Sequence, residues 1–231
     1  MTSMLGGPAV DAHQNDDAQT QMQRIEAAYR EAPWLQRLMV TYRPTICPTE
    51  PILRHVPANM RVLDVGCGIG LILITMALER RITSGIGIDV NGKAIDVARA
   101  AAKKLFGVDV RFLQRQSISE LGDSPFDVVT VIDVMHHVEP NAQHGFFFEC
   151  ANAVAPGGLL IYKDMGRRPL WMSLFNRLHD LILAHDIIHY VPLSDIKSWA
   201  NQHDLILIEE CAYRRIAYAH ELLVFRRKDL S

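Results

Sequence analysis

The sequence predicts an α/β protein built on a mostly parallel sheet of seven strands. From residue 61 onward, short apolar segments alternate with longer segments of helical pattern, an order typical of strand–helix–strand units. The apolar segments contain few polar residues, as expected for strands buried on both faces. The last two, 205–214 and 221–228, are joined by a short polar connection. Because a parallel crossover needs a dozen or more residues, these two strands must pair antiparallel.

Five further strands precede this pair, with helical segments between them. The strands are expected at 61–66, 85–90, 109–114, 126–133 and 158–164, and the helices at about 70–80, 92–106, 141–155 and 194–202. Pro156-Gly157-Gly158 predicts a turn at the start of the fifth strand. Helices that connect parallel strands cover both faces of the sheet, so we expect apolar packing on both sides.

The remaining segments extend this framework. Residues 1–17 are small and polar and are expected to form a disordered tail. Residues 18–56 are expected to form an N-terminal helical cap, and 57–231 the main domain. Within that domain, a helical insertion after the fifth strand is expected at about 167–190, where apolar and charged residues alternate in an amphipathic pattern.

The cap is expected to contain two helices. Residues 18–32 form one helical pattern and 34–43 another, with Pro33 between them. The segment "PTICPTEP" at 44–51 holds three prolines and predicts an extended connector. One face of the second helix is apolar and carries Trp34, Leu35, Leu38 and Met39.

The composition is that of an ordinary globular protein. The 231 residues carry a formal net charge of −2 at pH 7, which disfavours nucleic acid as a partner. The four cysteines lie far apart in sequence, so free thiols are expected rather than a zinc site. The N-terminus lacks a secretory pattern, and no segment is long and apolar enough for a transmembrane helix. These features predict a cytoplasmic protein.

A glycine-rich loop follows the first strand. Gly66, Gly68 and Gly70 would let the backbone approach a ligand closely. Asp64 lies two residues before the first glycine, where a carboxylate would repel a pyrophosphate but suit an ammonium or sulfonium group. Asp89 ends the second strand, a place where an acid accepts hydrogen bonds from ribose hydroxyls. The alternatives are that Asp64 only stabilises the loop and that Asp89 caps the next helix.

Several motifs together resemble the class I S-adenosylmethionine-dependent methyltransferase family of the small-molecule type. The segments "VLDVGCGIG", "GIGIDV", "FDVVTVIDVMHHV" and "APGGLLIYKD" carry the resemblance in order over residues 61–164. The resemblance implies a Rossmann-like fold, an antiparallel last strand and S-adenosyl-L-methionine as the cofactor. It implies no metal.

The resemblance also implies roles for single residues. Asp64 would lie near the methionine end of the cofactor, and Asp89 would bind the ribose hydroxyls. Gln116 and Ser117 would flank the adenine, where the family often has an acid and a small residue. A Gln amide can still pair with adenine. The complete expected cofactor set is Asp64, Gly66, Cys67, Gly68, Gly70, Asp89, Val90, Gln116, Ser117 and Asp133.

Two groups of histidines are candidates for chemistry. His136 and His137 follow the fourth strand, at the carboxyl edge of the sheet where ligands bind. Either could act as a general base, because histidine titrates near neutrality; the alternative is packing beneath the cofactor. His185, Asp186 and His189 have a spacing seen in metal sites, but a polar stripe on a helix is the favoured reading.

The insertion at about 167–190 bears on the acceptor. It is expected to pack on the core, to cover an aromatic, polyketide or lipid-like acceptor, or to form a homodimer contact or a peripheral membrane contact. The segment after the fourth strand reads "DVMH" and lacks an NPPY-like tetrapeptide, which disfavours a DNA amine or a glutamine side chain as acceptor.

These observations predict a methyltransferase for a small, mostly apolar metabolite, of a kind found in secondary metabolism. O-methylation of a hydroxyl is favoured, followed by C-methylation and then N-methylation of a small amine. One alternative is a non-catalytic S-adenosylmethionine-binding regulator or partner subunit. Another is a nicotinamide dehydrogenase, which the position of Asp64 disfavours.

Overall fold

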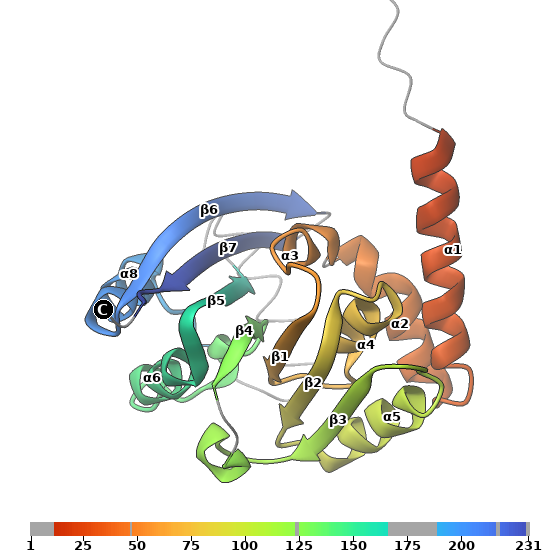
Figure 1. The fold of residues 1–231 in the computed structure, drawn as a ribbon, viewed down its shortest axis with the longest axis horizontal. Helices are drawn as coiled ribbons and strands as arrows, with labels where there is room; N and C mark the ends of the chain where they lie inside the picture. The colour runs from red at the N-terminus through yellow and green to blue at the C-terminus, as the bar shows by residue number, and fades with distance from the viewer. Residues whose placement is uncertain (1–11, 47, 123–124, 166–188, 216–217, 230–231) are drawn as a thin grey trace, which may run out of the picture.

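A seven-stranded sheet forms the centre of the protein (Figure 1). The structure, a computed structural model, describes residues 12–46, 48–122, 125–165, 189–215 and 218–229. The strands lie in the order β3-β2-β1-β4-β5-β7-β6. Their bounds are Met60–Val65 for β1, Ile82–Asp89 for β2, Asp109–Gln114 for β3, Phe126–Ile132 for β4, Val154–Met165 for β5, Leu205–Arg215 for β6 and Tyr218–Arg227 for β7.

The strand directions confirm the predicted sheet. The neighbours from β3 through β5 are parallel, whereas β7 is antiparallel to both β5 and β6. The reversed strand is therefore β7, which lies between β5 and the edge strand β6. The carboxyl ends of the parallel strands meet at one edge, and the loops after β1, β2 and β4 converge there.

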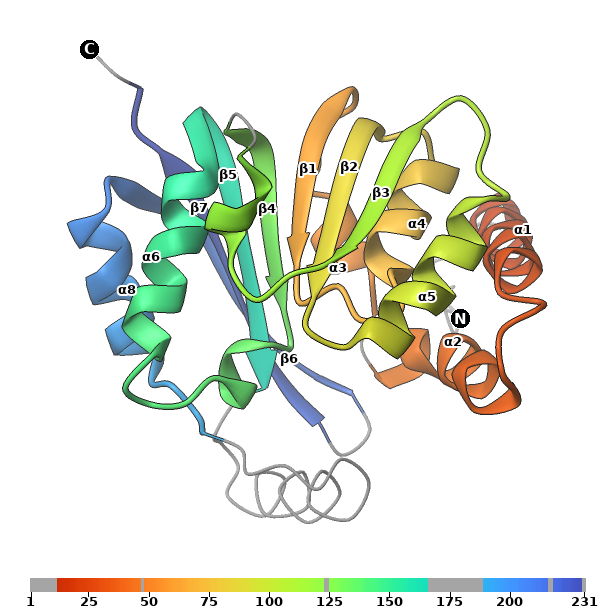
Figure 2. The same cartoon turned by 90° about the horizontal axis from the view of Figure 1, so that it is seen from below.

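Helices cover both faces of the sheet (Figure 2). One face packs against α4 (Leu71–Leu78) and α5 (Gly92–Ala102), with α1 (Ala12–Ala28), α2 (Trp34–Ile46) and α3 (Glu50–Leu53) on the same side. The other face packs against α6 (Gln143–Ala153) and α8 (Leu193–Gln202). Two short 3-10 helices, η1 (Ile118–Leu121) and η2 (Met135–His137), complete the described elements.

The central helices and strands are apolar for a physical reason. All residues of α4 except its last are buried, because this helix lies between the sheet and the cap. Side chains alternate between the two faces along each strand. Thus Tyr162 and Asp164 of β5 share one face, and Lys163 between them points to the other.

The cap differs from the prediction at two places. Helix α1 begins at Ala12, so residues 12–17 are helical rather than disordered. Residues 44–51 are not a continuous extended connector. Pro44 falls in the last turn of α2, where it removes one backbone hydrogen bond, and Pro51 stands at the start of α3, where its missing N–H is not needed.

The fifth strand also differs from its predicted start. β5 begins at Val154, so the Pro-Gly-Gly segment lies inside it. The register with β4 shifts between Phe126 and Val128, and Gly157 has φ of 73°. The extra residues therefore form a bulge rather than a separate turn.

The predicted helix of 169–188 falls outside the described residues, together with His185 and Asp186. In the parts of the chain that the structure describes, no helix has the length and apolar character needed to cross a bilayer.

Candidate functional site

The glycine loop between β1 and α4 adopts a conformation that requires glycine. Gly66, Gly68 and Gly70 have φ of 70°, 54° and 79°, a region that other residues rarely enter. A Cβ atom at Gly66 would lie 2.3 Å from Val134, and one at Gly70 would lie 2.5 Å from Phe112. Gly68 has no atom within 4 Å of its Cβ position, so a ligand can approach the backbone there.

Asp89 holds the loop in place from the end of β2. Its Oδ2 accepts a hydrogen bond from the Gly68 N–H at 2.8 Å, and its Oδ1 accepts one from the Asn91 N–H at 2.8 Å. Helix α5 is instead capped by Asn91, whose Oδ1 accepts from Lys93 and Ala94 at 3.1 and 3.3 Å. Asp89 is therefore not the helix cap, and its carboxylate lies beside the open space at Gly68.

Asp64 is a buried carboxylate at the carboxyl end of β1. Only 2 % of the residue is exposed. Its Oδ1 accepts a hydrogen bond from the Thr130 hydroxyl at 2.6 Å, while Oδ2 has no hydrogen-bond partner among the residues that the structure describes. Burial raises the pKa of Asp64 to about 7, against the lowering effects of Thr130 and Arg43. A buried unpaired carboxylate oxygen is costly, and a cationic ligand would satisfy it.

The helical cap contacts the glycine loop through a tyrosine. The Tyr29 hydroxyl, at the end of α1, donates a hydrogen bond to the Ile69 carbonyl at 2.8 Å. Tyr29 is 1 % exposed, so this bond is shielded from water. The cap is thus attached directly to the loop that bends around the candidate ligand site.

A charged cluster lies where β4 and β5 end. Lys163 is fully buried, and its Nζ lies 2.6 and 2.7 Å from the two carboxylate oxygens of Asp133. Arg43 of α2 lies 3.6 Å from the same carboxylate. Burial alone would raise the pKa of Asp133, but Lys163 and Arg43 outweigh it and hold the pKa well below its usual range. Asp133 has φ of 56°, so the pair also stabilises a left-handed backbone.

His136 and Asp164 form a buried dyad on the opposite face of β5. His136 Nδ1 is hydrogen-bonded to Asp164 Oδ1, and the His136 backbone N–H donates to Asp164 Oδ2 at 3.2 Å. The Tyr162 hydroxyl donates to Oδ2 at 3.3 Å. The residues of the dyad are 2 % and 6 % exposed. A carboxylate on Nδ1 fixes the orientation of the imidazole and stabilises its protonated form, as in other histidine bases.

His137 differs from its neighbour in its surroundings. It is exposed, and its ring centroid lies 4.1 Å from that of His136. Of the two predicted histidines, His136 therefore has the geometry of an oriented base.

Comparison with known proteins identifies the family. The sequence model of the methyltransferase domain matches residues 39–210, most of the chain. The chain belongs to this methyltransferase family. It has the class I, S-adenosylmethionine-dependent fold, and its cofactor is S-adenosyl-L-methionine.

Two curated relatives show the extent of the similarity. A ubiquinone biosynthesis O-methyltransferase of Alkalilimnicola ehrlichii is 34% identical over 157 residues, 64% of this chain and 61% of the relative. One of Hahella chejuensis is 31% identical over 178 residues, 73% of this chain and 71% of the relative. In the first of these relatives the chain spans less than two thirds of the length.

A solved structure shows the same fold. The magnesium protoporphyrin IX methyltransferase of Synechocystis, solved with S-adenosylhomocysteine bound, has a TM-score of 0.61 at 18% identity, covering 96% of this chain and 90% of that one.

The residues of the methyltransferase that were expected at the adenine have divided roles. The Ser117 hydroxyl donates to Glu149 Oε2 at 2.7 Å and caps η1, so its side chain has a structural role. Gln116 is exposed, and its backbone N–H donates to Glu120. Val90 is 65% exposed beside Asp89, and Cys67 is a free thiol whose pKa is raised by burial.

The chain returns from the insertion next to η2. The His189 N–H donates to the His136 carbonyl at 2.8 Å, and the Gln143 amide donates to the His189 carbonyl at 3.0 Å. The His189 ring lies 3.9 Å from Glu139. Among the described residues, no group of three or more His, Cys, Asp or Glu could hold a metal ion.

Four further side chains of the candidate site are not indicated by the sequence motifs. These are Tyr29, Thr130, Lys163 and Asp164. The one available signal was "YKD" at the end of the fifth strand, where two charged residues follow a buried apolar run. Charges at the carboxyl edge of a parallel sheet face the ligand site.

Proposed function

We propose that the enzyme transfers the methyl group of S-adenosylmethionine to a hydroxyl oxygen of a small aromatic or lipid-like acceptor. The His136–Asp164 dyad carries this proposal, because a hydroxyl must lose its proton and an oriented imidazole can accept it. The relatives that are named as O-methyltransferases support the same chemistry. Their names refer to ubiquinone biosynthesis and give no support to secondary metabolism.

In this proposal the residues at the carboxyl edge of the sheet would hold the cofactor. Asp89 would accept hydrogen bonds from the ribose hydroxyls, and the open backbone at Gly68 would leave room for the ribose and methionine. Gln116 would contact the adenine. Oδ2 of Asp64, which has no partner among the described residues, would accept a hydrogen bond from the amino group of the methionine portion.

The charged cluster at the ends of β4 and β5 serves the same end of the cofactor. Arg43 lies at the border of the site, where its side chain is 35% exposed and makes a long contact of 3.6 Å with Asp133. We assign Arg43 to the methionine carboxylate, because an Arg fork pairs well with a carboxylate. Lys163 keeps Asp133 ionised and fixed in position.

His136 would accept the proton of the acceptor hydroxyl at its second ring nitrogen, as the hydroxyl oxygen takes the methyl group and the methyl–sulfur bond breaks. The bound cofactor supplies an electrophilic methyl group on a sulfonium leaving group. Asp164 stabilises the imidazolium that forms. Burial of the dyad keeps bulk water from competing for the proton. A well-positioned base of this kind contributes about 10²–10⁴-fold to the rate.

The test is methyl transfer from radiolabelled S-adenosylmethionine to paired acceptors. Catechols should be methylated, whereas matched aromatic diamines should not. Calorimetric titration with S-adenosylhomocysteine, with NAD as control, tests cofactor binding separately. Transfer to diamines alone would overturn the O-methylation proposal. Cofactor binding without transfer to any acceptor would favour the alternative of a non-catalytic S-adenosylmethionine-binding regulator. The cytoplasmic location remains a prediction from the sequence.

A further inference from the structure

Helix α2 carries a row of large apolar side chains that face solvent. The exposed face of α2 is defined here by five residues. Their exposed fractions are 75% for Trp34, 50% for Leu35, 46% for Leu38, 46% for Met39 and 57% for Tyr42. The helix packs on the protein through its other side, where Val40 is 1 % exposed. The usual amphipathic arrangement, with the apolar side inward, is therefore reversed in α2.

No other described helix or strand exposes as many large apolar side chains as α2. Half of the large apolar residues that are exposed in the described parts of the chain belong to this helix. At 100° per residue the five positions fall within one arc of the helix surface. A contiguous apolar patch of this kind marks an interaction surface, whereas single exposed apolar residues such as Phe106 do not.

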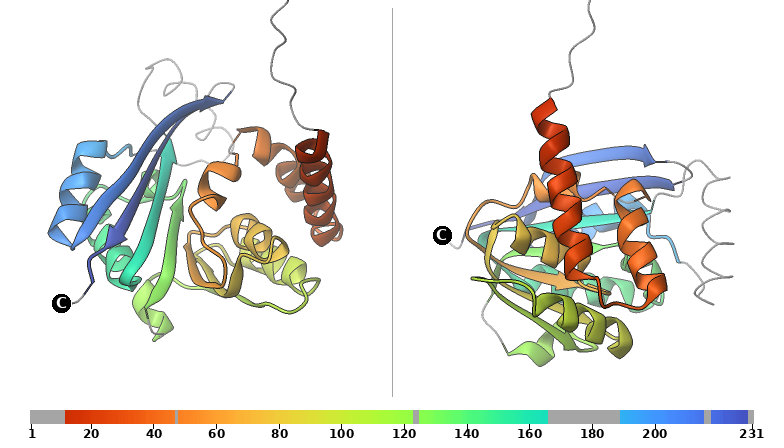
Figure 3. Two further views of the ribbon diagram at one scale, coloured as in Figure 1. Left: turned by 45° about the horizontal axis from the view of Figure 1, so that its top comes forward. Right: turned by 90° about the vertical axis from the view of Figure 1, so that its right-hand side faces the viewer.

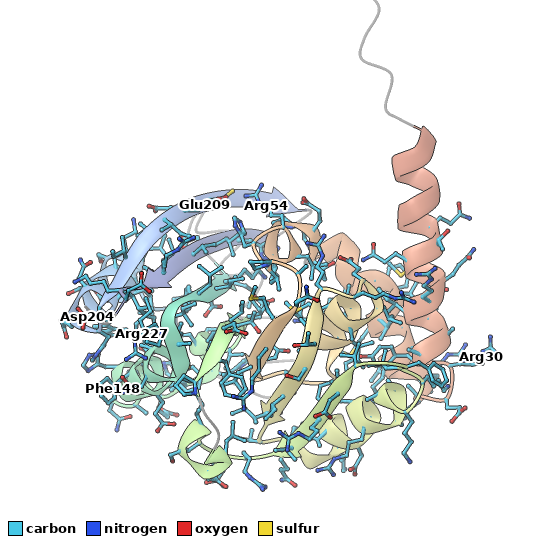
Figure 4. All side chains as sticks on the ribbon, viewed as in Figure 1. Arg30, Arg54, Phe148, Asp204, Glu209 and Arg227 are labelled. Carbon is cyan, nitrogen blue, oxygen red and sulfur yellow. The ribbon has the colours of Figure 1, made fainter. Side chains whose placement is uncertain are left out.

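Positive charges border this face. Arg37 lies beside Trp34 on the helix surface, whereas Arg43, beside Met39, is paired with Asp133 and belongs to the candidate cofactor site. Arg30 precedes the helix and points away from the body of the protein (Figure 4). Two acids lie nearby: the Glu31 carboxylate pairs with Lys104 at 3.2 Å, and the Glu26 carboxylate accepts a hydrogen bond from the Thr41 hydroxyl of α2 at 3.2 Å. Arg30 and Arg37 have no ion pair with any described residue.

The chemistry of this face fits a lipid surface. Tryptophan and tyrosine, here near the two ends of the helix, prefer the interface between headgroups and acyl chains. Leucine and methionine between them supply the apolar area, and flanking arginines attract anionic headgroups. A protein partner would need no such combination of aromatic ends and flanking cations.

The position of α2 relates this face to the site. Arg43 directly follows Tyr42 and contacts Asp133 where β4 ends. Figure 2 shows α2 at the outer side of the helical layer, toward the end of the molecule at which the arrows of β1 and β4 finish. Figure 3 shows that α1 and α2 form the outer part of this side of the protein.

We propose that the exposed face of α2 binds the surface of an anionic phospholipid bilayer, with the helix lying in the plane of the interface. The carboxyl edge of the sheet then lies next to the membrane, where an apolar acceptor dissolved in the bilayer can reach it. This last step rests on the proposed function. Membrane binding itself does not.

Vesicle sedimentation tests the proposal. The purified protein should bind vesicles of phosphatidylcholine and phosphatidylglycerol, and bind vesicles of phosphatidylcholine alone more weakly. The double variant Leu38→Glu/Met39→Glu should lose about tenfold or more in vesicle affinity, because it removes apolar area and adds like charge to the lipid. Phe106→Glu is the matched control, since Phe106 is 92% exposed and lies outside α2. It should bind as the wild type does.

A second measurement reports the contact directly. Tryptophan emission should shift to shorter wavelength on addition of anionic vesicles, and the shift should be reduced in Trp34→Phe. An unchanged shift in that variant would contradict insertion of Trp34.

Three other outcomes would overturn the proposal. The first is that the protein does not bind anionic vesicles, and the second is that the double variant binds them as well as the wild type does. The third is a dimer in solution that the double variant converts to monomer. That result would assign the face to a second copy of the chain. Affinity for S-adenosylhomocysteine should stay unchanged in the double variant. Vesicle binding without methyl transfer would remove the proposed function and leave the membrane surface in place.

Discussion

The ammonium group of Lys163 lies within 2.7 Å of both carboxylate oxygens of Asp133, in a position from which Lys163 has no access to solvent. A buried ion pair of this kind gains from low screening, but both partners have lost their hydration. Loss of one partner is therefore more harmful than loss of both. The pair also joins the ends of β4 and β5, since the Asp133 N–H donates to the Lys163 carbonyl at 2.8 Å.

Lys163→Met should reduce the free energy of unfolding by about 3–5 kcal/mol, because Asp133 keeps a buried charge without its main partner. Lys163→Met/Asp133→Asn should recover much of this loss. Urea unfolding at pH 7 measures both. Equal stability of the single and double variants would show that the pair is not coupled.

The pH dependence of stability tests the same pair. The pKa of Asp133 is depressed in the folded protein, so its stabilising effect is present above the unfolded pKa and disappears as pH falls through the folded pKa. Lys163→Met should therefore lose less stability than the wild type between neutral and acid pH. Parallel curves for the two proteins would argue against a depressed pKa at Asp133.

Asp64 should behave in the opposite way. Its folded pKa is raised to about 7, so the cofactor-free protein loses stability as pH rises from the unfolded value toward and through 7. Asp64→Asn should raise the melting temperature of the cofactor-free protein at pH 8 more than at pH 5. The same substitution should weaken binding of S-adenosylhomocysteine, because it removes the negative charge near the amino group. Thermal scans and calorimetry measure the two effects, and a variant that binds the cofactor as the wild type does would place Asp64 outside the site.

Asp89→Ala should weaken S-adenosylhomocysteine binding by about 1–3 kcal/mol, since ribose hydroxyls and the Gly68 N–H lose their acceptor. Asn91→Ala is the matched control. It removes the cap of α5 and should cost about 1 kcal/mol of stability while leaving cofactor affinity unchanged. If the two variants lose affinity equally, the role of Asp89 is confined to loop structure.

The dyad predicts a distinct kinetic signature. His136→Ala should reduce kcat by about 10²–10⁴-fold with little effect on cofactor affinity. Asp164→Asn should also lower kcat, because the imidazolium that forms during the reaction loses the carboxylate that stabilises it. His137→Ala should retain most of the activity. Full turnover in His136→Ala would exclude the base.

Much of the fold follows from local sequence patterns. The buried strands and the intervening helices are long apolar or periodic segments, and the antiparallel pairing of β6 and β7 follows from a connection too short for a crossover. The place of β7 between β5 and β6 depends on contacts between distant segments, so no local pattern predicts it. Residues 12–17 are helical although disorder was expected, because a polar composition alone does not exclude a helix.

The glycine loop could be predicted because its glycines and acids occupy fixed positions along the chain. The partners of the candidate catalytic groups could not be predicted in this way. Thr130 meets Asp64, and Asp164 meets His136, only because neighbouring strands align in a particular register. Similarly, Tyr29 reaches the Ile69 carbonyl from a helix that lies 40 residues earlier in sequence. Sequence position alone does not show which residues meet in space.

The position of β7 has a consequence for the order in which the molecule is made. β6 is hydrogen-bonded in the sheet through β7 alone, yet β6 precedes it in the chain. During synthesis β6 therefore emerges before its bridge to β5 exists, and the sheet can be completed only after residues 218–227 have left the ribosome. Until then the edge of β5 is unpaired and open to other strands. Nascent chains stalled before β7 should accordingly aggregate or recruit chaperones.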